Sequence, residues 1–276
     1  SACLDRIEAV FKEAELDDSG TDELFETADV PEIEFKNVTF AYDEKRDVLH
    51  DVSFSVQKNT MTALVGPSGG GKSTIASLLP RFWDVKDGSI LLRGKDIREI
   101  PLASLMDNIS MVFQRVYLFQ DTVYNNIAMG RTDATEDEVY EAAKKARCYD
   151  FIMALPEGFQ TVIGEGGASL SGGEMQRISI ARCILKDAPI VILDEATASV
   201  DADNESQIQA AISELVQGKT LLVIAHRLHT IAKADQILVI SDGRIAEQGS
   251  HETLIAANGL YHNMVKKRAS VTGFQK

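Results

Sequence analysis

The chain contains little cysteine, little positive charge and no long apolar segment. Its three cysteines, Cys3, Cys148 and Cys183, are odd in number and follow no metal-ligand or CxxC spacing, which is typical of free thiols in a reducing compartment. The longest apolar runs, 190–193 and 220–225, are far shorter than the roughly 20 residues of a membrane-spanning helix, and no signal peptide is visible. The formal net charge of −14 disfavours a broad basic surface, so we expect no nucleic acid as a partner.

The rest of the composition is that of an ordinary globular protein. The chain has 276 residues, 45% of them hydrophobic, which is enough for one large domain or two small ones. Residues 3–16 have apolar side chains at helical spacing, and the chain starts at Ser1 rather than at methionine, which is what we expect of a piece cut from a longer protein. The acidic stretch 17–29 predicts a solvated connector. We therefore expect a connector over residues 1–30 and one domain over residues 31–276.

A glycine-rich segment, GPSGGGKST, follows the apolar run 61–65 and precedes helix-forming residues 72–81. In this pattern a strand enters a turn whose backbone N–H groups bind phosphates, while a lysine neutralises their charge. Lys72 is expected to reach the β- and γ-phosphates of ATP, and the Ser73 hydroxyl to bind Mg²⁺. The alternative is a glycine-rich turn with a surface lysine. The predicted ATP-binding residues are Gly66, Pro67, Ser68, Gly69, Gly70, Gly71, Lys72, Ser73 and Thr74.

Two adjacent carboxylates, Asp194 and Glu195, follow the apolar run 190–193. A central parallel strand delivers an acid in this way to the carboxyl edge of a sheet. Beside a metal-bound triphosphate, Asp194 would hold Mg²⁺ and Glu195 would polarise the attacking water as general base. The alternatives are that Asp194 ends a strand by chance and that Glu195 only caps the next turn.

One histidine, His226, directly follows the apolar run 220–225 and is expected at the same sheet edge as the two carboxylates. A lone histidine is more often structural, but its position makes it a candidate for the catalytic site. The other histidines have no comparable position and are left as surface or packing residues: His50, His229, His251 and His262.

Apolar periodicity predicts the remaining elements and an α/β fold. Strands and helices alternate after residue 170, which predicts a mostly parallel sheet covered by helices. Residues 115–171 are predicted as a mainly helical insertion. Strands are expected at 33–40, 48–56, 89–92 and 109–113, helices at 123–129, 136–146, 149–155, 202–216, 253–257 and 260–267, and a hairpin at 236–248 that turns at Asp242-Gly243.

The segments GPSGGGKST, LSGGEMQR, IVILDEATASVD and the strand-end His226 together resemble the nucleotide-binding domain of ATP-binding cassette (ABC) transporters, from Pro31 onward. The resemblance implies a P-loop NTPase core with a mostly parallel sheet, an antiparallel β subdomain and an inserted α-helical subdomain. It also implies that Tyr42 stacks on adenine, that Gln114 senses Mg²⁺ and the attacking water, and that Asp201 communicates across a dimer. Tyr42 as a packed strand aromatic and Gln114 as an ordinary strand-end residue are the alternatives.

In this family the LSGG segment lies far from the phosphate loop of its own chain. The resemblance therefore implies that two nucleotide-binding domains, identical or related, meet head to tail. Ser171, Gly172 and Gly173 of one chain would then complete the γ-phosphate site of the other, with the helix N-terminus behind them. Because Glu195 and His226 are both present, we expect an active ATPase rather than a regulatory module without turnover.

Segment 161–167 resembles the part of exporter-type members that touches the coupling helices of a transmembrane domain. The exporter pattern has an arginine where this chain has Gly166, which predicts altered contact with that domain. Residues 3–16 resemble the connector that follows the last transmembrane helix of fused exporters, which would place the domain at the cytoplasmic side of a membrane. A soluble ABC ATPase acting on ribosomes or chromosomes is the alternative, but the tandem cassettes or long coiled coil of such proteins are absent from this sequence.

Overall fold

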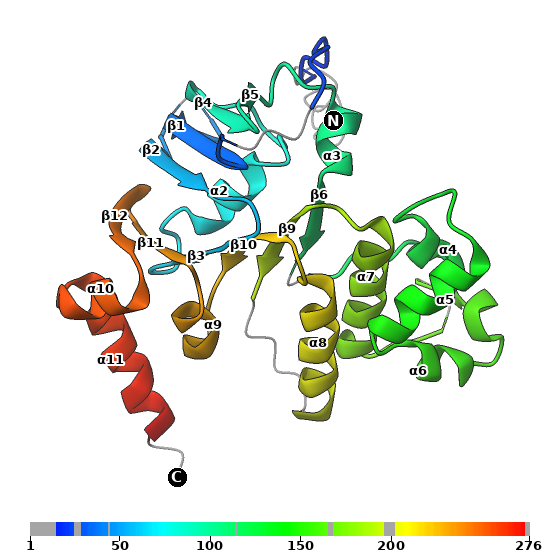
Figure 1. Cartoon of the computed structure of the whole chain (residues 1–276). Coiled ribbons are helices and arrows are strands. Elements are labelled where there is room, and N and C mark those ends of the chain that lie inside the picture. The colour runs from blue at the N-terminus through cyan, green and yellow to red at the C-terminus, as the bar shows by residue number, and fades with distance from the viewer. Residues whose placement is uncertain are drawn as a thin grey trace, which may run out of the picture.

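The computed structural model describes residues 15–24, 29–43, 45–113, 115–164, 168–195 and 202–273 (Figure 1). Three predicted functional positions lie outside these ranges, namely Gln114, Gly166 and Asp201, as do most residues of the expected N-terminal helix. Within them, the chain folds as the predicted α/β architecture, with sheets and helices in the expected order.

A six-stranded sheet forms the centre of the molecule, with the order β12-β11-β3-β10-β9-β6. Five of these strands, β3, β6, β9, β10 and β11, are mutually parallel. The last strand, β12, returns antiparallel to β11 through the predicted turn at Asp242 and Gly243. The strands are β3 (Met61–Val65), β6 (Ile109–Val112), β9 (Ile190–Asp194), β10 (Thr220–Ile224), β11 (Gln236–Ser241) and β12 (Arg244–Gly249).

The parallel strands are apolar without interruption because both faces of the sheet are buried. Along β3, Leu64 packs into one hydrophobic core, whereas Ala63 and Val65 pack into the other. The same alternation divides Val223 and Ile224 of β10 between the two cores. Alternate residues of these apolar strands therefore pack into opposite cores, which places the sheet between two layers.

One layer is an antiparallel sheet with the order β2-β1-β4-β5, which covers α2 (Lys72–Leu78) and one face of the central sheet (Figure 1). The rings of Phe35 and Phe54 stack across it with centroids 4.5 Å apart. Helix α2 ends earlier than predicted, with Leu79 as its C-cap before Pro80. The strands are β1 (Ile33–Phe40), β2 (Leu49–Val56), β4 (Asp87–Leu92) and β5 (Lys95–Asp96).

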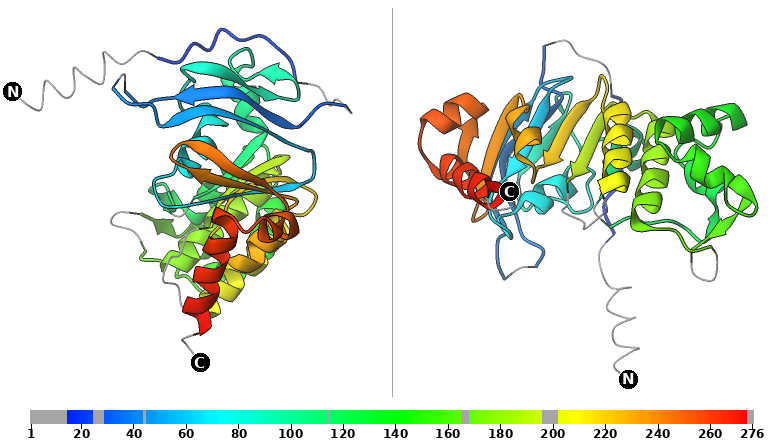
Figure 2. Two further views of the ribbon diagram at one scale, coloured as in Figure 1. Left: turned by 90° about the vertical axis from the view of Figure 1, so that its left-hand side faces the viewer. Right: turned by 90° about the horizontal axis from the view of Figure 1, so that it is seen from below.

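The other layer is helical and includes the predicted insertion (Figures 1 and 2). Its helices are α4 (Val123–Ala128), α5 (Glu136–Lys145), α6 (Tyr149–Met153), η1 (Gly158–Gln160), α7 (Gly172–Lys186) and α8 (Ala202–Leu215). A small antiparallel pair that the sequence analysis did not predict, β7 (Asp121–Thr122) with β8 (Val162–Ile163), closes the insertion on itself. Two-residue strands carry too few positions for periodicity to detect.

The remaining helices lie at the ends of this framework: α3 (Leu102–Asp107), α9 (Leu228–Ala232), α10 (His251–Ala256) and α11 (Leu260–Gly273). Helix α11 is anchored at its start, where the Glu247 carboxylate accepts hydrogen bonds from the backbone N–H groups of Leu260 and Tyr261. It continues beyond the predicted end at residue 267. No helix in the part of the chain that the structure describes combines the length and apolar character needed to cross a membrane.

The acidic stretch before the domain touches the folded part of the chain. The Asp18 carboxylate accepts a hydrogen bond from the Leu102 N–H, and the Asp22 N–H donates to the Glu99 carbonyl. Leu24 packs against the core beneath the antiparallel sheet. Residues 15–24 are thus laid over the domain around α3.

Candidate functional site

A cavity of about 540 Å³ lies at the carboxyl edge of the central sheet. Strands β3, β9 and β10 run parallel, so the segments that follow them meet at this edge and form the walls. Pro67 and Gly70 belong to the same loop but do not line the cavity. The lining residues are Val48, Gly66, Ser68, Gly69, Gly71, Lys72, Ser73, Thr74, Asp194, Ile224, His226 and Arg268.

The turn after β3 requires glycine at the point where it leaves the sheet. Gly66 has φ +141°, and a Cβ added there would lie 2.0 Å from the Ile240 carbonyl oxygen. Gly69 has φ +76° but open space around it, so its requirement is conformational rather than steric. The loop is also fixed from behind, because the Gly243 N–H donates to the Gly70 carbonyl at 2.9 Å. The backbone therefore wraps around the cavity in a defined shape.

The Lys72 side chain is buried and folds back over this loop. Its Nζ donates hydrogen bonds to the carbonyl oxygens of Gly66, at 3.0 Å, and Pro67, at 2.7 Å. Burial lowers the pKa of Lys72, repulsion by Arg268 lowers it further, and attraction to Asp194 opposes both. An ammonium group whose bonds go to neutral carbonyl oxygens keeps its positive charge for an anionic ligand.

Asp194, Ser73 and His226 face the cavity from three different segments. Burial raises the pKa of Asp194, while His226 and Lys72 lower it. Burial also lowers the pKa of His226, against the attraction of Asp194. The neutral imidazole is thereby favoured, which has one donor and one acceptor nitrogen for a ligand or a water.

These donors fit a hard divalent cation. Ser73 supplies a hydroxyl oxygen and Asp194 a carboxylate in the same cavity, and Mg²⁺ prefers oxygen ligands while keeping waters or phosphate oxygens in its other positions. Among residues with described positions, no group of three or more His, Cys, Asp and Glu side chains could hold a metal alone. Any Mg²⁺ at this site would take further ligands from water or from a nucleotide.

Glu195 follows the Asp194 strand end, but its carboxylate turns to the segment that precedes and begins α9. It accepts hydrogen bonds from the backbone N–H groups of His226, at 3.0 Å, and Arg227, at 3.1 Å, and from the Thr230 hydroxyl. The side chain is buried and is not among the residues that line the cavity. In this conformation Glu195 caps the turn that leads into α9, which lies more than thirty residues later in the sequence.

Tyr42 stands at the rim of the phosphate loop. Its hydroxyl hydrogen-bonds the Thr74 hydroxyl at 2.9 Å, and its ring meets Phe40 and Trp83 edge-on at 4.9 and 5.1 Å between centroids. The side chain remains 51% exposed. These contacts fix the ring beside the loop and leave half of its surface for a further stacking partner.

The LSGG segment lies at the start of α7, within the helical layer and away from α2 (Figure 1). Ser171 is the N-cap, and its hydroxyl accepts from the Glu174 N–H while the Glu174 carboxylate accepts from the Ser171 N–H. Ser171 and Gly172 are exposed, whereas Gly173 is buried beside Asn204. None of the three predicted residues lines the phosphate-loop cavity of its own chain.

Three cavity residues were missed by the sequence analysis: Val48, Ile224 and Arg268. Arg268 arrives from α11, seven residues after the buried Tyr261 and hence on the same helix face. Met264 and Val265 pack that face against the core. No motif marks Arg268, although the apolar spacing of α11 together with its length could have placed it on the inner face.

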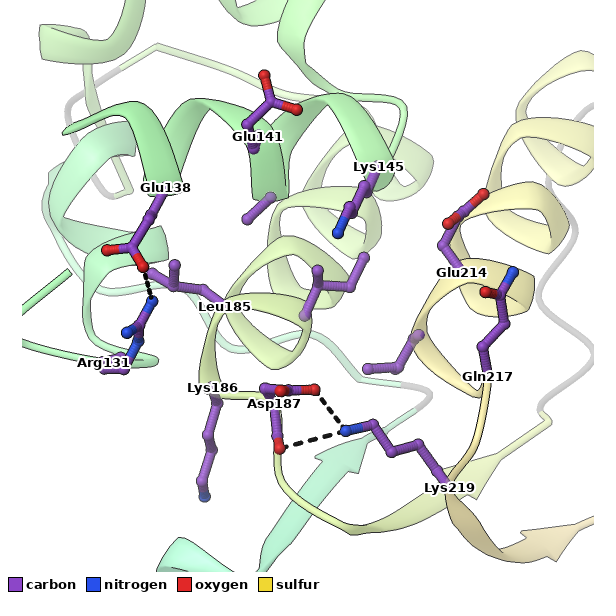
Figure 3. A pocket seen from close by; sticks show the side chains of 13 residues that line it. Arg131, Glu138, Glu141, Lys145, Leu185, Lys186, Asp187, Glu214, Gln217 and Lys219 are labelled. Carbon is purple, nitrogen blue, oxygen red and sulfur yellow. Dashed lines mark hydrogen bonds and ion pairs between the residues drawn. The ribbon is translucent and has the colours of Figure 1, made fainter. Parts of the chain in front are cut away.

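A second cavity, of about 690 Å³, lies at the amino edge of the sheet (Figure 3). Arg131 pairs there with Glu138 at 2.7 Å, and Lys219 pairs with Asp187. Lys186 also lines it, and its Nζ donates to the carbonyl oxygens of Met106 and Ile109. These charges hold the helix ends together and belong to no predicted motif.

Known proteins are similar to this chain in sequence and in fold. A sequence profile of the ABC transporter family matches residues 49–198. An ATP-dependent lipid A-core flippase of Legionella pneumophila (strain Paris) is 52% identical over 235 residues, which are 85% of this chain and 40% of the relative. ABC transporter aclQ of Aspergillus oryzae (strain ATCC 42149 / RIB 40) is 49% identical over 266 residues, which are 96% of this chain and 33% of that protein.

A solved structure, described as a bacterial Atm1-family ABC exporter with ATP bound, has a TM-score of 0.85 and 43% identity, and the match covers 97% of this chain and 46% of that one. The chain thus spans 40% or less of the length of these two curated relatives. The family profile covers more than half of the chain, and the fold agrees with the solved exporter. The chain therefore belongs to the ABC transporter family and is an ATPase domain of that family.

Proposed function

We propose that the chain is the motor of an ABC exporter, in which two such domains close head to tail around ATP and open after its hydrolysis. The observation that carries this proposal is that the phosphate loop and the LSGG segment of one chain lie apart. The phosphate-loop cavity holds Lys72, Ser73, Asp194 and His226, whereas the LSGG segment begins a helix elsewhere in the same chain. One copy has two different halves of a nucleotide site and cannot join them by itself.

The phosphate loop binds the triphosphate in this proposal. Backbone N–H groups between Gly66 and Thr74 surround the phosphates, and the Lys72 ammonium exchanges its carbonyl partners for phosphate oxygens. Tyr42 stacks on the adenine from the rim. Together these residues bind ATP through its charge at one end and its ring at the other.

Hydrolysis requires a positioned water and stabilisation of the charge that develops on the phosphates. Mg²⁺, held by Ser73 and Asp194 with Gln114 as a further ligand, supplies that stabilisation when bound. Glu195 acts as general base towards the water. The neutral imidazole of His226 forms a hydrogen bond to the γ-phosphate. Gln114 links this site to the helical insertion.

The second half of the site comes from the partner. The Ser171 hydroxyl accepts its cap bond from the Glu174 N–H and still has its own proton to donate to a γ-phosphate oxygen. The exposed Gly172 and the N–H of Gly173 stand beside it, and Asp201 is proposed to report across the same interface. Loss of the γ-phosphate removes these contacts, so hydrolysis separates the two domains.

The transmembrane partner is proposed to dock on the helical insertion. A cavity of about 420 Å³ there is lined by segment 116–118, Ile163, Gly164, segment 168–170 and Met175. Tyr117, at its rim, is 75% exposed. An apolar groove of this kind fits the cytoplasmic end of a transmembrane domain, which would place the chain at the cytoplasmic side of a membrane, as in the exporters that it resembles.

Complementation between two inactive variants tests the head-to-tail arrangement. Lys72→Ala removes the phosphate-loop half and Ser171→Arg blocks the LSGG half, so each variant alone should hydrolyse ATP at background rate. In an equal mixture, half of the dimers carry one intact composite site, and we expect about a quarter of the wild-type activity. Phosphate release at fixed total protein measures it.

The controls separate the possible failures. Glu195→Gln should keep ATP binding, lose turnover and trap an ATP-dependent dimer that size-exclusion chromatography detects. A mixture that stays inactive, or a Ser171→Arg chain that is fully active alone, contradicts the shared site. If the composite site works, reconstitution with a transmembrane domain distinguishes export from the alternative of a non-transport ABC ATPase.

A further inference from the structure

The buried carboxylate of Glu195 is held by three donors on the segment that leads into α9. Two are the backbone N–H groups of His226 and Arg227, and the third is the hydroxyl of Thr230. The Glu195 N–H also donates to the Ile224 carbonyl at 3.0 Å, so the backbone beneath the side chain is fixed to β10. Three of these four bonds join the end of β9 to the start of α9, and the fourth joins it to the end of β10.

This arrangement satisfies the carboxylate away from the place where a nucleotide would bind. Asp194, which precedes Glu195 in sequence, and His226, whose N–H donates to its carboxylate, both line the phosphate-loop cavity, but Glu195 does not. A general base must come within hydrogen-bond reach of the water whose proton it takes. The carboxylate therefore has to leave at least some of these donors before it can act.

Of the three donors, only Thr230 is a side chain that a mutation can remove without changing the backbone. It lies on the first turn of α9, which begins after Arg227. Arg227 is itself tied to α8, because its Nη1 lies 2.6 Å from the Glu205 carboxylate. A displacement of α8 relative to the sheet would act on the same segment that holds Glu195.

We propose that Thr230 is a positioning residue that holds the Glu195 carboxylate on the α9 segment in the nucleotide-free chain and so limits the rate at which the base becomes available. This inference rests on the proposed role of Glu195 as general base. Thr230 touches neither the water nor the nucleotide and acts only through Glu195. Rearrangement of the α8 and α9 segments on domain closure would release the carboxylate towards the site.

The test compares ATP hydrolysis by the 276-residue chain and its Thr230→Val variant, which keeps the shape and removes the hydroxyl. A hydrogen bond to a charged group is strong enough that its loss should raise kcat by about three- to tenfold, with KM changed by less than about twofold. Thr230→Ser restores a hydroxyl and should return kcat towards the wild-type value. An unchanged or lower kcat in a folded Thr230→Val chain overturns the proposal.

Two further variants separate this effect from general destabilisation. Thr220→Val makes the same substitution at the opposite end of β10, where the buried hydroxyl accepts from the Asn59 N–H at 2.9 Å. It should lower the melting temperature without raising kcat. In the Glu195→Gln background, Thr230→Val should have no effect, and an increase that persists there overturns the link to Glu195.

The outcome also distinguishes a failure of the proposed Thr230 role from a failure of the proposed general-base role of Glu195. If Glu195→Gln hydrolyses ATP at the wild-type rate, the assignment of the base fails, and the proposed role of Thr230 fails with it. If Glu195→Gln is inactive and Thr230→Val is no faster than wild type, only the holding role of Thr230 is wrong.

Discussion

Two polar cavities lie at opposite edges of the same sheet, and they use their charges differently. At the amino edge, Lys219 pairs with Asp187 and Arg131 with Glu138, while Lys186 donates to two backbone carbonyl oxygens (Figure 3). At the carboxyl edge, Lys72 is likewise held by two backbone carbonyl oxygens, and Arg268 lines the same cavity. The lining of the larger cavity carries four basic and four acidic side chains, whereas that of the smaller one carries Lys72 and Arg268 against Asp194, which leaves a positive charge for an incoming anion.

The difference follows from the direction of the parallel strands. The carboxyl ends of β3, β9 and β10 lead into the phosphate loop, Asp194 and His226, so the predicted site residues lie together at that edge. The amino ends of β9 and β10 follow the ends of α7 and α8, and Asp187 and Lys219, which lie between those helices and strands, pair there. Cavity size alone would favour the amino edge, whereas the charge balance of the lining favours the carboxyl edge.

The largest expected effect comes from a comparison in which one lysine at each edge is replaced by methionine. Lys72→Met removes the ammonium that faces the cavity, and ATP affinity should fall by about 100-fold, since charge-assisted hydrogen bonds to phosphate are lost. Lys219→Met removes an ion pair whose carboxylate is largely exposed, and ATP affinity should stay within about twofold. Isothermal titration calorimetry measures both. Comparable losses for the two variants would contradict the assignment of the edges.

A second pair of variants compares the backbone of the two edges. Gly66→Ala places a Cβ 2.0 Å from the Ile240 carbonyl at φ +141°, and we expect a loss of about 2 to 4 kcal/mol in unfolding free energy together with loss of ATP binding. Gly218→Ala at the amino edge has φ +67° and open space around it, so the loss should be about 1 to 2 kcal/mol.

Urea denaturation gives both free energies, and nucleotide titration below the transition gives the binding. Gly218→Ala should bind ATP as the wild type does. If Gly66→Ala is no less stable than Gly218→Ala, the close approach to Ile240 does not constrain the loop.

The sequence predicted most of the carboxyl edge because its residues belong to contiguous motifs. The loop 66–74 and the acid pair 194–195 are local patterns, and continuous apolar strands fix which edge they share. The orientation of the Glu195 side chain was not predictable in the same way. It depends on Thr230, more than thirty residues later, whose hydroxyl carries no signal at the sequence level.

The amino edge could not be predicted as a cavity at all, since it forms from the ends of three helices that meet only in the fold. The β7–β8 pair escaped for a related reason, because each strand has two residues and is stabilised by its partner rather than by its own pattern. Arg268 combines both difficulties. Its place in the cavity depends on the anchoring of α11 by Glu247, a contact made between two different elements.

The smallest expected effect concerns Arg268, which tests how far the carboxyl edge extends. Arg268→Gln removes a positive charge that acts on Lys72 and His226 from α11, and ATP affinity should fall by about three- to fivefold, because the interaction is a partly screened charge rather than a direct part of the phosphate loop. Lys267→Gln removes an equal charge from an exposed neighbouring position and should leave the affinity unchanged.

Titrations at low and physiological salt measure the ATP affinity of both variants. A loss for Arg268→Gln that disappears as salt is raised fits a charge acting across solvent, whereas equal affinities for the two variants at low salt would remove α11 from the nucleotide site.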